Sequence, residues 1–324
     1  MDQPFVRLAR AATVLAFIVV TVGAWVRLTD AGLGCPDWPG CYGQLVVSAD
    51  VATDPGVQAE FGDRPFDTGK AWREMVHRYL ASALGLMCVA LAAMGWMNRS
   101  KRGQPWRVPL ALLALVVVQG LLGMWTVTLL LKPIVVVAHL LGGFATLGLL
   151  FWLSRPKPRP IAPARGLRTL ASAAGAAVVL QIALGGWTSA NYAALACPDF
   201  PTCQTQWWPE VADFEEAFVL WRGIGVDYEG GVLDHPARVA VHFTHRLGAI
   251  AAALLTGIFG WLLFRRPEAK LAGAAVLFVL ILQLVIGSGI VLFGVPLSLA
   301  VAHNGVAALL LLTIIDAHKR IWRH

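Results

Sequence analysis

The feature that most constrains this chain is a series of long apolar runs. A run of about 20 apolar residues spans the hydrocarbon core of a bilayer as one helix, and such runs recur along the 324 residues. The sequence is 57% hydrophobic and only 14% charged, too few charges to solvate the surface of a globular protein of this length. We therefore predict an all-α integral membrane protein with eight transmembrane helices, at about 11–28, 77–97, 108–130, 133–153, 168–190, 239–264, 271–293 and 297–316.

The connections between the apolar runs alternate in charge. Every second connection is basic, whereas the two long ones, 29–73 and 190–238, carry most of the acidic residues. The positive-inside rule then predicts cytoplasmic termini and outward-facing long loops. The first run continues into Trp25 without a cleavage site, so we expect a retained helix rather than a signal peptide. The simplest setting is a bacterial inner membrane with periplasmic loops, and a mitochondrial inner membrane is the alternative. Because the basic residues are spread over short loops, the net charge of +7 does not indicate nucleic-acid binding.

Four of the five cysteines lie in the outward loops. Cys35 and Cys41 are separated by a short proline-containing segment, as are Cys197 and Cys203, so each pair can close a small loop in an oxidising compartment. We predict the disulfides Cys35–Cys41 and Cys197–Cys203. A redox-active pair is the alternative, and metal ligation is a weaker one. Cys88 lies within a span and is expected to be a packed apolar residue.

The two long loops begin alike, which indicates a tandem duplication. The segment Cys-Pro-Asp-Trp-Pro at 35–39 is matched by Cys-Pro-Asp-Phe-Pro at 197–201. Each half contains four predicted spans, and an even number of spans makes the two repeats parallel, related by a pseudo-twofold axis along the membrane normal. We predict two tandem four-helix bundles, 1–158 and 159–324, divided at a proline-rich linker.

Four histidines occupy matching positions in the predicted spans: His77 corresponds to His245, and His139 to His303. Ionisable groups within spans are costly in lipid, so they mark candidate functional sites. Paired imidazoles in a four-helix bundle can hold a haem iron from both axial positions, and we predict one such site in each half. The same helices carry small residues that would leave room for a flat macrocycle, namely Ala81, Ser82, Ala83, Gly142, Gly143, Gly248, Ala249 and Gly305.

Other interpretations of these histidines are hydrogen bonds to neighbouring helices, a proton relay in a transporter built on parallel repeats, and a zinc site. Duplication of all four positions argues against isolated hydrogen bonds, and no cysteine lies at ligand spacing for zinc. His235, His318 and His324 receive no role.

Each half carries an arginine directly after its first histidine. The guanidinium groups of Arg78 and Arg246 would suit the propionates of a haem, with snorkelling to the membrane interface as the alternative. In the second long loop, Trp207, Trp208 and Phe214 predict an interfacial helix that caps the pocket, unless they are ordinary aromatic-belt residues.

The repeat is broken at Glu74, three residues before His77. A carboxylate there shares the helix face of the ligand and could take protons or stabilise cationic charge on a substrate. The alternative is an ion pair with Arg73 or Arg78. The aligned residue of the second half is His242, which competes with the nearby His245 as a ligand. The two halves are therefore expected to have different roles.

These residues resemble those of the haem A synthase family. The likeness is carried by Gly-Ala-Trp-Val-Arg-Leu-Thr at 23–29, the cysteine segment at 35–44 and Glu74-x-x-His77-Arg78, and the eight-span plan extends it over essentially the whole chain. The resemblance implies that haem O is the substrate and haem A the product. In that reaction the methyl group on carbon 8 of the porphyrin becomes a formyl group, for use in cytochrome oxidase. The long loops are where the chain departs from the family.

The resemblance also implies a role for each candidate residue. His77 and His139 would ligate the substrate haem, with Glu74 as the catalytic carboxylate, and His245 and His303 would ligate a permanent haem b that passes electrons. Haem O synthase, cytochrome oxidase assembly factors and an electron donor or acceptor are the implied partners. The alternative function is a dihaem b-type electron-transfer cytochrome, which needs paired histidines but no carboxylate.

Overall fold

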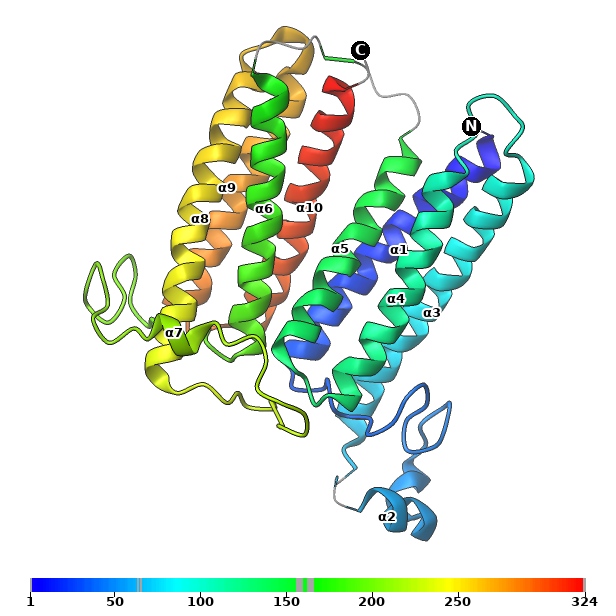
Figure 1. The fold of residues 1–324 in the computed structure, drawn as a ribbon, viewed down its shortest axis with the longest axis vertical. Coiled ribbons are helices and arrows are strands. Elements are labelled where there is room, and N and C mark those ends of the chain that lie inside the picture. The colour runs from blue at the N-terminus through cyan, green and yellow to red at the C-terminus, as the bar shows by residue number, and fades with distance from the viewer. Residues whose placement is uncertain (1, 63, 65, 156–159, 162–165, 323–324) are drawn as a thin grey trace.

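The computed structural model describes residues 2–62, 64, 66–155, 160–161 and 166–322, and within them the regular elements are all helices, without a β-strand (Figure 1). Within these residues, eight helices are long and apolar enough to span a membrane, as predicted. Their bounds are α1 Gln3–Leu28, α3 Thr68–Met97, α4 Arg107–Thr128, α5 Pro133–Ser154, α6 Leu167–Ala190, α8 His235–Phe264, α9 Lys270–Leu292 and α10 Leu297–Ile321.

The long helices form two groups of four, seen side by side in Figure 1. In the first group α1 packs against α3 and α5, and α4 completes the ring between them; in the second, α6 and α9 each pack against α8 and α10. The groups meet where α1 touches α10 and where α5 touches α6 and α10. The predicted division after residue 158 lies outside the described residues, and the pseudo-twofold relation stays a prediction.

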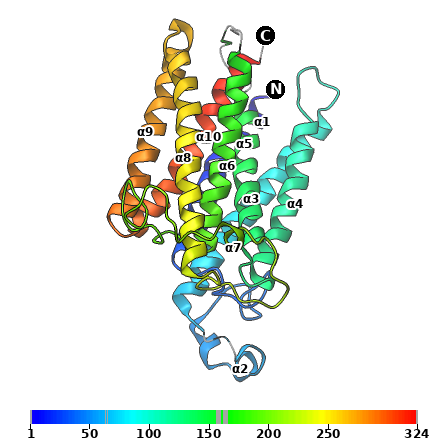
Figure 2. The same ribbon diagram turned by 60° about the vertical axis from the view of Figure 1, so that its left-hand side comes forward.

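Both termini lie at one end of the molecule, and the long loops lie at the other (Figures 1 and 2). The long loops also carry the short helices η1 Ala49–Thr53, α2 Pro55–Phe61 and α7 Phe214–Ala217. An even number of spans in each group gives this arrangement. The cytoplasmic position of the termini remains a prediction from loop charge.

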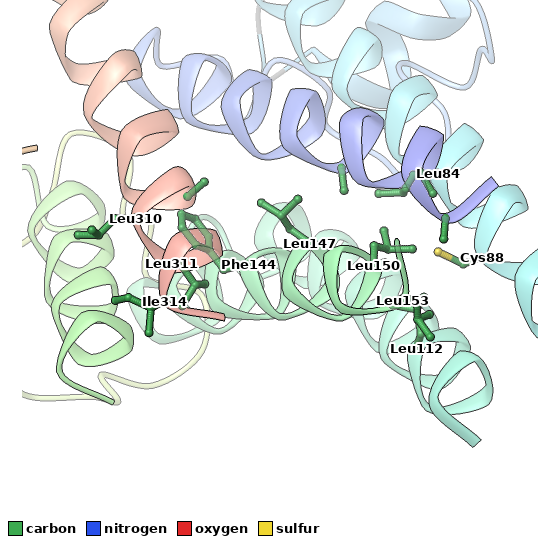
Figure 3. Packing of buried hydrophobic residues seen from close by; sticks show 14 of the residues in the cluster. Leu84, Cys88, Leu112, Phe144, Leu147, Leu150, Leu153, Leu310, Leu311 and Ile314 are labelled. Carbon is green, nitrogen blue, oxygen red and sulfur yellow. The ribbon is translucent and has the colours of Figure 1, made fainter. Parts of the chain in front are cut away.

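α5 lies at the centre of the main packed cluster, shown in Figure 3. Phe144 of α5 lies beside Leu311 of α10 on one side, and further along α5 Leu150 packs toward α3 and α4. Because lipid tails are as apolar as leucine, such packing stabilises the bundle through close contact rather than by removal from water. Cys88 is fully buried in this cluster without a disulfide, which confirms the prediction of a packed cysteine.

Two helices begin further outward than the apolar runs suggest. α3 starts at Thr68 because the carboxylate of Asp67 accepts a hydrogen bond from Lys70 N at 2.9 Å. α8 starts at His235, where Asp234 accepts one from Ala237 N at 3.0 Å. These N-caps satisfy backbone donors at the helix ends. The polar residues around the first histidine of each half are therefore helical rather than part of a loop.

The predicted interfacial helix of the second loop is only the single turn α7. Trp208 stacks on Phe214 at 5.8 Å between centroids and meets Phe243 of α8 edge-on at 5.2 Å. Trp207 is exposed. Trp208 therefore attaches the loop to α8, and the predicted longer interfacial helix is not formed.

Candidate haem sites and the disulfide loops above them

The first candidate site lies between α3 and α5. His77 on α3 and His139 on α5 face each other with ring centroids 6.5 Å apart and ring planes at 81°. A metal held between two imidazoles bonds each ring at about 2 Å, which together with the two ring radii places the centroids about 6 Å apart. The Nδ1 atom of each ring is buried and has no hydrogen-bond partner among the described residues. The spacing and the unused nitrogen atoms fit a pair of axial ligands.

Glycines on the opposing helices make room for these two rings. A Cβ atom on Gly23 of α1 would lie 2.9 Å from His77 Cε1, closer than real Cβ contacts, and one on Gly123 of α4 would lie 3.5 Å from His139 Cε1. His77 therefore packs directly against the backbone of α1, whereas a Cβ atom at position 123 would make only an ordinary contact with His139.

The second candidate site repeats this arrangement. His245 of α8 faces Gly185 of α6, where a Cβ atom would lie 3.2 Å from Cε1, and His303 of α10 faces Gly287 of α9, with the corresponding distance 2.9 Å. His303 is near enough to interact electrostatically with His245. The structure thus gives each histidine pair a matching pair of glycines.

Glutamine side chains distinguish the second site from the first. Gln181 Nε2 lies 3.0 Å from His245 Nδ1 and donates to the backbone oxygen of His245 at 3.0 Å. Gln283 Nε2 lies 3.2 Å from His303 Nε2. Gln119, the first-half counterpart of Gln283, has its Nε2 atom buried without a partner among the described residues. Amides therefore hold the imidazoles of the second half, an asymmetry that adds to the one at Glu74.

Two disulfide loops lie on the outer ends of α3 and α8. Cys35–Cys41 and Cys197–Cys203 are both bonded, each with Cα atoms 4.7 Å apart, which confirms the predicted pairing. Each loop contains a cis X-Pro peptide bond and an isolated bridge just after its second cysteine.

An aspartate closes each of these loops in the same way. Asp37 accepts hydrogen bonds from Tyr42 N and Gly43 N, and Asp199 accepts from Gln204 N and Thr205 N at 2.8 and 3.0 Å. Burial alone would raise the pKa of Asp199, yet these bonds and one from Thr202 hold it below its usual value.

Glu74 connects the first disulfide loop to the helix that carries His77. Its side chain is 5% exposed, and Oε2 accepts a hydrogen bond from Cys35 N at 2.9 Å. Oε1 forms an ion pair with Arg78, which also donates to the backbone oxygen of Asp37 at 3.0 Å. The sequence left Arg73 and Arg78 as possible ion-pair partners of Glu74, and in the structure the partner is Arg78. The carboxylate is thus fixed between a disulfide loop and an arginine, one helical turn from the ligand.

The matching position of the second half is built differently. His242 Nδ1 lies 3.0 Å from Ala193 O, and Arg246 donates directly to Thr202 O at 2.6 Å and Cys197 O at 2.8 Å. His242 is thus engaged with the loop, whereas His245 faces the glycine and the glutamine. This contrast favours His245 as the ligand. The predicted propionate contacts of the two arginines stay predictions, since both groups already bind loop carbonyl groups.

Several of the small residues expected beside the histidines face other groups. A Cβ atom on Gly142 would overlap Gln119, one on Gly248 would overlap Gln181, and Gly305 faces Phe17. The reason is geometric: these glycines lie on the helices that carry the histidines, whereas a ring extends toward the opposite helix. Gly23 and Gly185, which do make room, were not predicted, although their equivalent places in the repeat are a signal for them.

Known proteins similar to this chain match it over almost its whole length. The profile of the COX15-CtaA family, described as cytochrome oxidase assembly protein, matches residues 6–315. The chain is 42% identical to the Heme A synthase of Shewanella oneidensis, over 97% of this chain and 96% of that protein. It is 30% identical to the Heme A synthase of Caulobacter vibrioides and 26% to that of Halalkalibacterium halodurans, each over 92% of this chain and 90% of the relative. The chain belongs to the COX15-CtaA family of cytochrome oxidase assembly proteins.

Proposed function

We propose that this chain is a haem A synthase, an oxidoreductase of the membrane. Its substrate is haem O, and the methyl group on carbon 8 of the porphyrin is oxidised to a formyl group through two hydroxylations and loss of water. Full-length identity of 42% to a protein named Heme A synthase supports this. The observation that carries it in the structure is the His77–His139 pair, 6.5 Å apart between centroids, beside a carboxylate that the second half lacks.

In the first half, His77 and His139 hold the iron of the substrate from its two faces. Gly23 keeps the His77 ring in place by close backbone contact, and Gly123 faces the His139 ring at an ordinary contact distance. The substrate's position is therefore set by helices α1, α3, α4 and α5 together. A fixed orientation brings one methyl group to the reactive place and leaves the others unchanged.

Glu74 is the catalytic carboxylate of this proposal. The N–H group of Cys35 and the guanidinium group of Arg78 hold its two oxygen atoms, so the side chain keeps one orientation about one helical turn from His77. From there it can accept or return a proton as the methyl carbon is oxidised, while its burial excludes bulk water. Cys35–Cys41 fixes the loop that supplies the N–H donor.

In the second half, His245 and His303 are the residues that would hold a permanent haem b. Such a haem supplies single-electron transfer when it is bound. Gln181 lies against Nδ1 of His245 and would orient that imidazole, in the way that hydrogen bonds from surrounding residues tune other metal ligands. Gln283 lies against Nε2 of His303, whose Nδ1 atom has no partner among the described residues. Arg78 and Arg246, at the loop ends of the two pockets, are the proposed propionate-binding residues. The buried Nε atom of Arg246 has no partner among the described residues.

The proposal includes a setting and partners. The protein lies in a bacterial inner membrane with its termini in the cytoplasm, receives haem O from a haem O synthase and exchanges electrons with a donor or acceptor. The product goes to cytochrome oxidase and its assembly factors.

The substitution Glu74→Gln tests this function. Glutamine keeps the shape and can still accept from Cys35 N, but it cannot exchange a proton. We expect bound haem and both disulfides to be retained, while haem A formed in cells supplied with haem O falls by at least about 100-fold, the usual contribution of a general acid or base. Haem extraction and mass spectrometry measure the product.

The matched control is Glu60→Gln, at an exposed glutamate of α2 in the first long loop, which should form haem A like the unmodified protein. Unchanged haem A formation in the Glu74→Gln protein would instead favour a dihaem electron-transfer cytochrome.

A further inference from the structure

A cavity of about 750 Å³ lies between the two helix groups, and none of the four histidines proposed as ligands lines it. It is lined by α5 from Leu141 to Trp152, by α6 from Ala171 to Ile182 and by α10 from Leu311 to His318. The side chains along it are apolar except at one end, where Ser172 and His318 lie. Its volume is that of a small-molecule pocket, about 300–1,000 Å³.

The length of the cavity matches one leaflet of a bilayer. Leu141 and Trp152 lie about 16 Å apart along α5 at 1.5 Å per residue. This is about half of the roughly 30 Å hydrocarbon core. The polar end lies close to the helix ends nearest the termini, since Trp152 is near the end of α5 and Ser172 near the start of α6. The groove therefore runs from one membrane surface to the middle of the bilayer.

An arginine lies beside the polar end of the cavity. Ser172 Oγ lies 3.4 Å from His318 Nε2, and the ring of His318 stacks on Trp322 at 5.4 Å. Arg168 lies over the ring of Trp322, with its Cζ atom 5.2 Å from the ring centroid. Arg168 and Ser172 are four residues apart and therefore share a face of α6. The Nε atom of Arg168 is buried and has no partner among the described residues. A donor without an acceptor at the mouth of an apolar groove is suited to an anionic ligand.

The nearby acid does not neutralise this end. Asp316 pairs with Arg155 at 2.8 Å and with Arg320 at 3.8 Å. On the other side of the mouth, Lys319 lies over Trp152 at 4.4 Å and donates to its backbone oxygen. Basic pockets between transmembrane helices near a membrane surface bind anionic lipid head groups.

We propose that this cavity binds one anionic phospholipid. Its phosphate lies at Arg168, Ser172 and His318, and an acyl chain fills the groove between α5, α6 and α10. The lipid would then join the two helix groups in the leaflet where direct contacts between them leave this space. A neutral isoprenoid could fill the same groove but would gain nothing from the arginine. The inference is independent of haem oxidation.

Native mass spectrometry of the purified full-length protein tests the proposal, with mixed micelles that contain equal amounts of phosphatidylglycerol and phosphatidylcholine. We expect one phosphatidylglycerol molecule to be retained in preference to phosphatidylcholine. Arg168→Gln should weaken phosphatidylglycerol binding about fivefold, the effect of one cation near a membrane phosphate. Arg107→Gln is the control, because that exposed arginine lies over Trp106 at 5.0 Å at the same end of the molecule but outside the cavity.

A second pair of variants tests the groove itself. Ala176 is exposed to it, so Ala176→Phe should fill the groove and abolish the lipid adduct without disturbing the packed core. Ala114→Phe, at an exposed alanine of α4, should leave the adduct unchanged. Equal retention of both lipids, equal effects of the two arginine substitutions, or survival of the adduct in Ala176→Phe would each overturn the proposal. Circular dichroism and the gel-filtration profile of each purified variant show that it has folded.

Discussion

Each of the four imidazoles proposed as ligands faces a glycine on a different helix from its own. The pairs are His77 with Gly23, His139 with Gly123, His245 with Gly185 and His303 with Gly287. A methyl group on most of these glycines would press on Cε1 of the ring, and the ring would have to move. In a bundle of close-packed helices, the position of a side chain is set by what the neighbour leaves free. Three of the four distances, those at Gly23, Gly185 and Gly287, are shorter than an ordinary Cβ contact, which indicates that ring position is controlled closely at His77, His245 and His303.

Gly287→Ala tests this control, because the new Cβ atom would lie 2.9 Å from His303 Cε1. We expect haem affinity of the second site to fall about tenfold, as for other changes that disturb the orientation of a metal ligand. His303→Ala gives the reference for complete loss. Haem per protein, measured by absorbance during titration, is the readout.

Gly289→Ala is the matched control on the same helix, since its Cβ atom would make an ordinary contact of 3.5 Å with Leu299. If both alanine variants bind haem equally well, glycine does not set the position of the ring.

At the scale of elements, the second long loop covers the outer end of the first helix group. Tyr228 N donates to Leu130 O at 3.1 Å, and Lys132 lies 3.2 Å from the ring centroid of Trp221 and donates to Gly223 O. Lys132 is only 1% exposed. The loop of one half is thus attached to the connection between α4 and α5 of the other, directly outside the end of the helix that carries His139.

Lys132→Met should release this attachment, because it removes the charge while keeping most of the volume. A desolvated cation–π contact is worth about 2 kcal/mol, so local opening of residues 221–229 should become about 30-fold more frequent. Hydrogen exchange of these backbone amides measures the opening.

Lys70→Met provides the control, since Lys70 pairs with Glu229 of the same loop at 3.4 Å but is partly exposed. Exposed ion pairs contribute about 0–1 kcal/mol, and the exchange rates should change less than about fivefold. Equal exchange in the two variants would show that Lys132 does not hold the loop.

The sequence predicts the helices better than it predicts their surroundings. The apolar runs locate every span, and the repeated cysteines locate both disulfides, because these features depend on local pattern. The outward extension of α3 depends on the cap at Asp67, which lies beyond the apolar run. The contact of Glu74 with Cys35 N joins residues distant in sequence, and no periodicity encodes it. The space for each imidazole is likewise set by a glycine on another helix, which no local sequence pattern encodes.

At the scale of the whole molecule, the halves meet along several helices and also through their loops. Arg27 of α1 donates to Ser189 O at 2.7 Å and lies over the ring of Tyr192 at 4.2 Å. Asn304 of α10 donates to Val20 O at 3.1 Å. Contacts of this kind at both loop and membrane depth hold the two groups in one arrangement, with all long loops at one end.

The sidedness of that arrangement can be measured with single new cysteines. Glu60→Cys in the first long loop should react with a membrane-impermeant maleimide in intact spheroplasts, and Lys101→Cys should react only after permeabilisation. The native cysteines give little background, because four are disulfide-bonded and Cys88 is buried. The opposite labelling pattern would reverse the predicted orientation.

Each imidazole and the glycine that it faces lie on different helices, and this has a consequence for inheritance and for engineering. A graft of α3 alone into another bundle would transfer His77 but leave behind Gly23, which belongs to α1. The transplanted ring would then meet a foreign side chain. The smallest portable unit of such a site is accordingly a complete set of four helices, and copying by whole-half duplication preserves every partner at once.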